Sequence, residues 1–362
     1  MKKPATSLVY IGTYADADRE SIFLYQLNPQ TGELNKIKGF VGGKKTSYMA
    51  IDKLRRHLYV VNERDDYEER ESGAVCSFLI DRQTGYLTFL NRVASLGSLP
   101  VHVALEDSGK AVLVANYKTG NVAVLPIQEN GELAEASDLR QHLGAGPDEE
   151  RQESAHAHYT AFSPDRRLVF VVDLGIDKLL CYYLDATKGT LIPAKQPVAY
   201  AASPGTGPRQ LSFHPNGYYA YIIHELKPIV TALCYDSING TFIEIQTIET
   251  VPADYKGENK CGGIQVSPDG KYLYGSNRGH NSIVVYAIDE ASGKLNLVEY
   301  MPSGGKWPRE FTIDLTGNIL LVANQKSNNI ATFRIDKNTG RLHATGYQTE
   351  VKKPVFLMVV PI

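Results

Sequence analysis

The sequence predicts an all-β fold, a seven-bladed β-propeller with four-stranded antiparallel blades. Two observations carry this prediction. Seven copies of one pattern of four short β-segments follow one another along the 362 residues, and the chain begins and ends partway through a copy. A repeat of roughly 50 residues with several strands in each copy is typical of propeller blades.

The clearest copy covers residues 261–300. Its turns contain Pro-Asp-Gly and Ser-Gly, in which proline presets φ and glycine supplies a positive φ. We therefore expect four strands in this copy, over Gly263–Val266, Tyr272–Ser276, Ser282–Ile288 and Leu295–Tyr300. A single meander of this kind cannot bury both of its faces, so it needs a neighbour on each side.

A polar residue ends the second predicted strand of every copy, and this position aligns the copies. Successive aligned positions are 49, 54, 57, 51, 53 and 47 residues apart. The spacing is too long for helical repeats and indicates seven blades. The aligned residues are Thr13, Asn62, Asn116, Asp173, His224, Asn277 and Asn324.

The two ends of the chain predict how the ring closes. Residues Ser7–Thr13 already have the second-strand pattern, and Pro354–Val360 form a lone first-strand pattern. We expect the C-terminal strand to pair with the N-terminal blade, because such closure removes the exposed edges of an open array. The repeat covers nearly all of the chain, so residues 1–362 are predicted to form a single domain.

Composition excludes some classes of function. The chain has 38 Lys and Arg residues against 40 Asp and Glu, a net charge of −2. This balance argues against a nucleic-acid-binding or membrane-surface protein. The first residues contain no apolar run typical of a signal peptide, and the four cysteines have no CxxC spacing. We therefore expect reduced, buried cysteines and a cytoplasmic location; the oligomeric state is left open.

The connections between strands predict which face of the ring is functional. In an antiparallel blade, the first-to-second and third-to-fourth turns share one face, and these turns are short. The long connections belong to the other face, where functional residues tend to lie on a rigid scaffold. They are residues 62–73, 141–157, 201–208 and 251–262.

Charged and polar side chains gather at the strand ends that open on this second face. Starts of first strands carry His158, Arg209 and Arg309. Ends of second strands carry Glu63, Tyr117, Glu225, Arg278 and Gln325, each directly after an aligned residue. First strands line the central channel of a propeller, so these side chains are expected to converge on one polar funnel for an anionic ligand. His156 and Asn277 are further candidates for binding it.

Each candidate also has a structural interpretation. Arg209 and Arg309 could pair with acidic loops as scaffold ion pairs, and Arg278 could pair with Glu225. His156 and His158 form an H-x-H pattern that can ligate a metal, but a third ligand at suitable spacing is not evident. Neither a metal nor a cofactor is therefore expected. The acidic runs 65–71 and 148–153 are interpreted as solvated loops.

At these residues the chain resembles the seven-bladed propeller lactonases, which include bacterial 6-phosphogluconolactonase and, more distantly, fungal carboxymuconate cyclase. The resemblance spans the chain and is most specific in residues 207–215, His224-Glu225-Leu226 and 276–279. It implies hydrolysis of 6-phosphoglucono-δ-lactone, a step of the pentose phosphate pathway, without metal or cofactor. The family's site positions fall on His158, Arg209, Glu225 and Arg278. His224 departs from the asparagine often found there.

The residues suit this chemistry. Opening a lactone needs a water activated by a general base, and Glu225 or His158 can serve. The oxyanion needs positive charge, which Arg278 or Arg209 could supply. The remaining arginine, with Gln325, could hold a phosphate or carboxylate.

Two other functions stay open at this point. A lactonising cycloisomerase could use the same His and Glu as proton donors. A non-catalytic binding propeller is the third possibility, but it would not need converging Arg, Glu and His and would show apolar patches on its rim.

Overall fold

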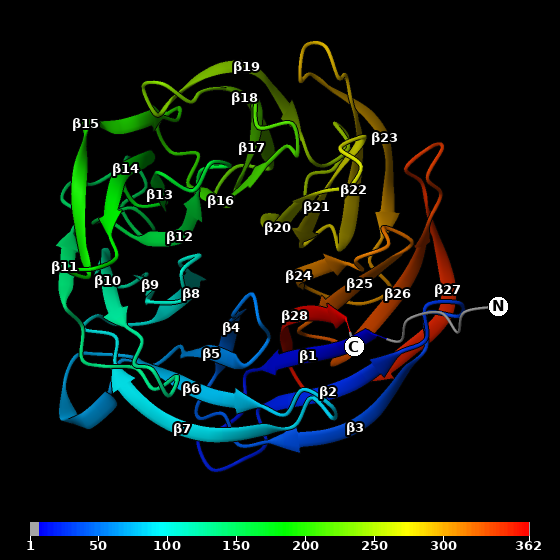
Figure 1. The fold of residues 1–362 in the computed structure, drawn as a ribbon. Coiled ribbons are helices and arrows are strands. Elements are labelled where there is room, and N and C mark those ends of the chain that lie inside the picture. Colours follow the sequence, from blue (N-terminus) through cyan, green and yellow to red (C-terminus); the bar gives the residue numbers. More distant parts are fainter. Residues whose placement is uncertain (1–6, 362) are drawn as a thin grey trace.

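The computed structural model describes residues 7–361, and within this range the chain forms seven four-stranded antiparallel sheets arranged in a ring (Figure 1). The strands nearest the centre, one for each blade, are β28 (Pro354–Pro361), β4 (Thr46–Ile51), β8 (Pro100–Leu105), β12 (Ala157–Phe162), β16 (Pro208–Phe213), β20 (Lys260–Val266) and β24 (Pro308–Ile313). The second strands are β1 (Ser7–Thr13), β5 (His57–Asn62), β9 (Ala111–Asn116), β13 (Val169–Asp173), β17 (Tyr219–His224), β21 (Tyr272–Arg278) and β25 (Ile319–Asn324).

The third and fourth strands complete each blade toward the rim. The third strands are β2 (Ile22–Leu27), β6 (Ala74–Ile80), β10 (Asn121–Pro126), β14 (Lys178–Asp185), β18 (Ile229–Asp236), β22 (Ser282–Ile288) and β26 (Asn329–Ile335). The outermost strands are β3 (Leu34–Phe40), β7 (Leu87–Ala94), β11 (Asp138–Gln141), β15 (Thr190–Ala201), β19 (Thr241–Glu249), β23 (Leu295–Pro302) and β27 (Leu342–Glu350). One short 3-10 helix, η1 (Tyr67–Glu69), lies in the connection between β5 and β6.

The predicted seven-bladed propeller is confirmed. Six of the seven second strands end at the aligned polar residue, and β21 runs one residue further, to Arg278. The reason is local: turn residues and strand-forming runs alternate so regularly that each hairpin is specified by its own sequence. Strands β5, β9, β21 and β25 are buried along their whole length, because each lies between two paired strands and two neighbouring blades.

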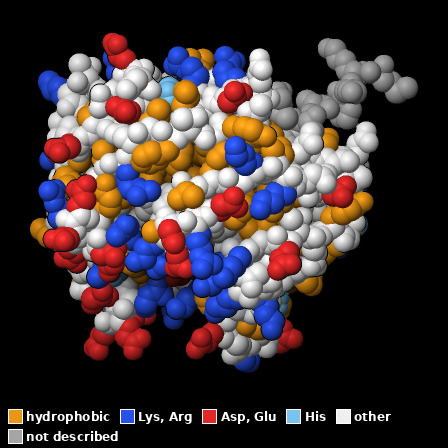
Figure 2. Space-filling view, turned by 90° about the horizontal axis from the view of Figure 1, so that it is seen from below, with side chains coloured by type: hydrophobic (Ala, Val, Ile, Leu, Met, Phe, Trp, Pro, Cys, Tyr) orange, Lys and Arg blue, Asp and Glu red, His pale blue; other side chains and the backbone are white. Residues whose placement is uncertain are grey.

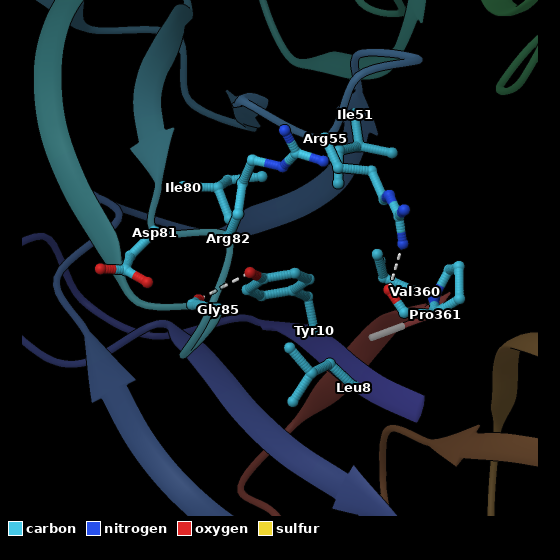
Figure 3. A pocket seen from close by; sticks show the side chains of 10 residues that line it. All are labelled: Leu8, Tyr10, Ile51, Arg55, Ile80, Asp81, Arg82, Gly85, Val360 and Pro361. Carbon is cyan, nitrogen blue, oxygen red and sulfur yellow. Dashed lines mark hydrogen bonds between the residues drawn. The ribbon is translucent and has the colours of Figure 1, made fainter. Parts of the chain in front are cut away.

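The predicted closure is confirmed as well. The first sheet has the order β28-β1-β2-β3, so the last strand of the chain pairs antiparallel with the first. Arg55, in the turn between β4 and β5, donates a hydrogen bond to the Pro361 carbonyl and so ties the closing strand to the next blade (Figure 3). The residues drawn there line a cavity of about 150 Å³ on the face of the tight turns.

Tyrosine hydroxyls join neighbouring blades in a repeated way. A second-strand tyrosine donates to the carbonyl of a positive-φ glycine in the third-to-fourth turn of the following blade, as Tyr10 does to Gly85 at 2.6 Å (Figure 3). Without this bond the buried phenolic oxygen would lack a hydrogen-bond partner. Each bond also fixes the distance between two neighbouring blades. The same bond recurs as Tyr59–Gly131, Tyr221–Gly293 and Tyr274–Gly340.

The connections follow the predicted division, with one difference. The predicted connections lie on one face, over residues 63–73, 142–156, 202–207 and 250–259. The connection 127–137 is long but lies on the opposite face, which the sequence analysis did not predict. It is a packed segment: Leu133 is buried, and the Gly131 carbonyl accepts hydrogen bonds from the preceding blade.

The outer strands are half exposed and carry both signs of charge. Figure 2 views the edge that β3 and β7 form in Figure 1, and Lys and Arg lie interspersed with Asp and Glu in the lower half of that view. Phe89 of β7 is 50% exposed.

Within residues 7–361 there is no helix with the length and apolar character needed to cross a bilayer.

Candidate active site

Glu225 is the centre of the site. It directly follows β17, and its carboxylate contacts three guanidinium groups from three different parts of the ring. Oε2 lies 2.7 Å from Nη2 of Arg278 and 3.0 Å from Nε of Arg209. Oε1 lies 2.6 Å from Nη2 of Arg151. Since Glu225 is only 6% exposed, these contacts replace the water that an ionised carboxylate would otherwise bind.

β-Bulges aim the inner-strand side chains of the site. Pairing of β16 with β17 shifts register between Pro208 and Gln210, so Arg209 is the extra residue. The same shift occurs at His158 in β12 and at Arg309 in β24. A bulge leaves its residue unpaired and redirects its side chain. Each of the three predicted first-strand residues is thus the extra residue of a β-bulge, at the same position in its copy of the repeat.

His158 lies beside the carboxylate. Its Nε2 is 3.9 Å from Oε2 of Glu225, and its Nδ1 has no hydrogen-bond partner among residues 7–361. Burial, reinforced by the nearby Arg209 charge, lowers the pKa of His158 well below its usual value, although Glu225 acts in the opposite direction. The imidazole is therefore neutral near pH 7 and keeps one nitrogen able to accept a proton.

The charges around Glu225 hold it ionised. Burial alone would raise its pKa, but Arg278 and Arg209, followed by His158 and Arg151, hold the pKa well below the usual range. Burial and the Arg278 charge lower the pKa of Arg209 to about 10, which still leaves it a cation near neutral pH. Three guanidiniums facing one carboxylate leave two positive charges without a carboxylate partner in the described part of the chain.

Arg309 has its own partner, as the structural interpretation allowed. Its Nη2 is 3.2 Å from Oε2 of Glu63, on the 63–73 connection, and its guanidinium lies 5.0 Å from the ring centre of Tyr14. The Tyr14 hydroxyl donates to the same Glu63 oxygen at 2.5 Å. Arg309 is therefore matched one to one, unlike the arginines around Glu225.

Two further predicted binding residues differ in whether their side-chain amides already have hydrogen-bond partners. Gln325 leaves its Oε1 buried and without a hydrogen-bond partner in residues 7–361. Asn277 uses its amide fully: Nδ2 donates to the Thr250 carbonyl at 2.6 Å, and Oδ1 accepts from Thr250 and Asn259. These contacts fasten the 250–259 connection to β21, so they favour a positioning role for Asn277; substrate binding by either residue stays a prediction.

His156 is held by the scaffold. Its ring stacks on Tyr117 with centres 4.6 Å apart, and its Nδ1 lies 2.9 Å from the Tyr117 carbonyl. Its Nε2 is 3.3 Å from a carboxylate oxygen of Glu153. Both ring nitrogens are thus occupied by protein groups. Within residues 7–361, no set of three His, Cys, Asp or Glu side chains is grouped so that it could hold a metal ion.

Arg151 is the site residue that the sequence analysis missed. It belongs to the acidic run 148–153, which was interpreted as a solvated loop. That interpretation is wrong for Arg151 and Gln152: Gln152 is fully buried and donates to the Leu174 carbonyl, while Arg151 bridges Glu225 and the Tyr117 hydroxyl. A lone arginine among carboxylates in the longest connection was the available signal.

The fold and the site together define a class of protein, a propeller with an arginine-held carboxylate and a neutral histidine at its centre. Residues 8–359 match the family model described as "Lactonase, 7-bladed beta-propeller". The chain therefore belongs to the seven-bladed propeller lactonase family, as its resemblance implied.

Named relatives and solved structures agree with this assignment. The chain is 38% identical over 314 residues to 6-phosphogluconolactonase of Bacillus subtilis, covering 87% of each protein. It is 32% identical over 324 residues to 6-phosphogluconolactonase of Formosa agariphila, covering 87% of this chain and 88% of the relative. The periplasmic gluconolactonase PpgL of Pseudomonas aeruginosa superposes with a TM-score of 0.91 at 32% identity, over 98% of this chain and 99% of that structure.

Proposed function

We propose that this protein hydrolyses 6-phosphoglucono-δ-lactone to 6-phosphogluconate at the site around Glu225. The observation that carries the proposal is the excess of positive charge there: three guanidiniums share a single buried carboxylate. Such an excess attracts an anionic substrate and can stabilise a second developing negative charge. The relatives named 6-phosphogluconolactonase support the choice of lactone.

Hydrolysis follows from the placement of these groups. A water molecule adds to the lactone carbonyl carbon, and the resulting oxyanion is stabilised by the positive charges of Arg278 and Arg209, through N–H groups other than those that donate to Glu225. The tetrahedral intermediate collapses by breaking the bond to the ring oxygen. That oxygen takes up a proton and becomes the free hydroxyl of the product acid.

His158 is the better candidate for the base that activates the water. Both groups have a pKa well below the usual range, but the oxygens of Glu225 already accept three charged donors, whereas Nδ1 of His158 has no hydrogen-bond partner within residues 7–361. His158 is neutral and buried beside it, and its imidazole can take the proton of the water and return it to the ring oxygen. In this scheme Glu225 orients the arginines and favours the transient imidazolium.

The test is a pH-stat assay of freshly prepared 6-phosphoglucono-δ-lactone beside unphosphorylated glucono-δ-lactone. We expect acid release well above the spontaneous rate, faster for the phosphorylated lactone. A progress curve equal to the buffer blank for both lactones would refute the proposal. An assay of the lactonisation of an unsaturated dicarboxylate, followed by absorbance, tests for the cycloisomerase reaction.

We also propose that the protein works in a reducing, cytoplasmic compartment. All four cysteines are unpaired, and three of them are buried. Free thiols are typical of proteins that are not exposed to oxidising conditions. Because one structural relative is a periplasmic enzyme, cell fractionation with compartment markers is the deciding measurement.

A further inference from the structure

A cavity of about 490 Å³ lies next to Glu225, on the face of the long connections. Residues of three segments line it, 148–151, 226–228 and 251–260, the last of which ends at the start of β20. Its volume is in the range of small-molecule sites. None of the candidate catalytic or binding residues named from the sequence lines it.

The cavity adjoins the reacting groups through residues that touch both. Arg151 lines it and at the same time contacts Glu225 at 2.6 Å. Leu226 lines it and follows Glu225 directly in the chain. Lys260 lines it, and its backbone carbonyl accepts a hydrogen bond from Nε of Arg278 at 3.2 Å. A ligand with one end at Glu225 can therefore place its other end in this cavity.

Two lysines that line the cavity have no ion-pair partner in the described part of the chain. Lys227 and Lys260 line it, and within residues 7–361 neither ammonium lies within 4.0 Å of a carboxylate. Three carboxylates also line the cavity: Glu150 and Glu258 are exposed, as Lys227 is, and Asp148 accepts the backbone N–H groups of residues 150 and 151, whereas Lys260 is partly buried. An Nζ group without a partner at the wall of a polar cavity is suited to a phosphate oxygen.

We propose that this cavity is the subsite for the phosphate of the substrate, with Lys227 and Lys260 as the residues that distinguish phosphorylated from unphosphorylated lactones. The inference rests on the proposed lactonase function. The phosphate of 6-phosphoglucono-δ-lactone is carried on the exocyclic C6, next to the ring oxygen, so it projects from the ring close to the reacting carbonyl. The cavity likewise adjoins Arg151, which contacts Glu225. Arg309 is a weaker candidate because Glu63 already compensates it.

The experiment compares wild type with the double variant Lys227→Gln/Lys260→Gln. The control is Lys256→Gln, which removes one positive charge from the 251–260 segment at a residue that does not line the cavity. We expect the double variant to lose at least about tenfold in the ratio of kcat/KM for the phosphorylated lactone over glucono-δ-lactone, equivalent to about 1.4 kcal/mol. The control is expected to keep the wild-type ratio.

Calorimetric titration with 6-phosphogluconate and with gluconate separates this proposal from the lactonase proposal. If wild type hydrolyses neither lactone, the proposed function fails, and the titration still decides the subsite. Weaker binding of 6-phosphogluconate to the double variant, with gluconate binding little changed, supports the subsite. Equal 6-phosphogluconate affinities, or an unchanged kcat/KM ratio in the double variant, would overturn it.

Discussion

Arg209 and Arg278 donate to the same oxygen of Glu225, at 3.0 Å and 2.7 Å, although they lie 69 residues apart in adjacent blades. Arg209 also donates to the Gly262 carbonyl, and Arg278 to the Cys261 carbonyl. Both guanidiniums are therefore fixed before a substrate arrives. Because these bonds hold each guanidinium in place, its remaining N–H groups are preorganised to stabilise an oxyanion.

Glutamine substitutions at positions 158 and 225 should distinguish the general base from the residue that holds the arginines in place. His158→Gln is expected to lower kcat by roughly 10²–10⁴-fold, the usual contribution of a general base, with KM and Tm little changed. Glu225→Gln is expected to lower activity and stability together, by about 3–5 kcal/mol in unfolding free energy, because it leaves buried guanidiniums unpaired. Steady-state kinetics and urea unfolding of both variants provide the measurements. Full turnover with His158→Gln would make Glu225 or solvent the base.

Lysine in place of Arg209 should rescue only part of what alanine loses. The Arg209 side chain bonds Glu225 through Nε and Gly262 through Nη1, and a single ammonium cannot occupy both positions. We expect Arg209→Ala to lower kcat/KM strongly and Arg209→Lys to recover a minor part of it. Comparable kcat/KM values for Arg209→Lys and wild type would show that charge alone matters there.

The protein should lose stability as the pH falls below about 6.5. Burial lowers the pKa of His102 and of His224 to about 3, and the pKa of His158 is also well below normal. A histidine with a depressed folded-state pKa binds its proton only after unfolding, so its contribution is complete above the unfolded pKa and is lost as the pH falls. Each such group contributes a slope of up to about 1.4 kcal/mol per pH unit.

Glu225 acts in the same direction at lower pH. Its folded-state pKa is held well below that of the unfolded chain, so its stabilisation is present above about 4.5 and is lost as the pH falls further. The histidine contribution is measured by urea unfolding at pH 8, 7, 6 and 5. The urea midpoints are expected to be similar at the first two pH values and to decline at the last two. An unfolding free energy that stays constant down to pH 5 would contradict the predicted loss of the histidine contribution.

Removal of residues 354–362 should destabilise the whole ring. Strand β28 pairs with β1 along its length and buries Val355, Phe356 and Leu357. Its loss exposes the edge of β1 and the apolar surface of two neighbouring blades. Thermal unfolding followed by circular dichroism should show a large drop in Tm, and a truncated chain that melts like the intact one would rule out this contribution of closure.

Activity is expected to survive dialysis against EDTA. The proposed chemistry uses arginine and histidine groups, and both nitrogens of His156 already have protein partners. The check is the rate of lactone hydrolysis before and after chelation, with added zinc or manganese as the reverse step. Loss with EDTA and recovery with metal would promote His156 and His158 to ligands.

The sequence by itself determined the architecture of this protein. Turns such as Pro268-Asp269-Gly270 and the alternation of apolar residues act within a few positions, so the number of blades, the strand ends and the closing strand could be derived without tertiary information. The convergence of Arg209, Glu225 and Arg278 was also predictable, because equivalent positions of a repeat open on the same face of the ring.

Only the tertiary structure determined which charged side chains meet in the site and in which direction they point. The bulges at His158, Arg209 and Arg309 arise from register shifts between paired strands, which no single strand encodes. Arg151 reaches Glu225 from a distant connection, and Glu63 compensates Arg309 from two blades away. These contacts depend on where long loops settle once the ring has closed, so their physical cause is packing between blades rather than local sequence.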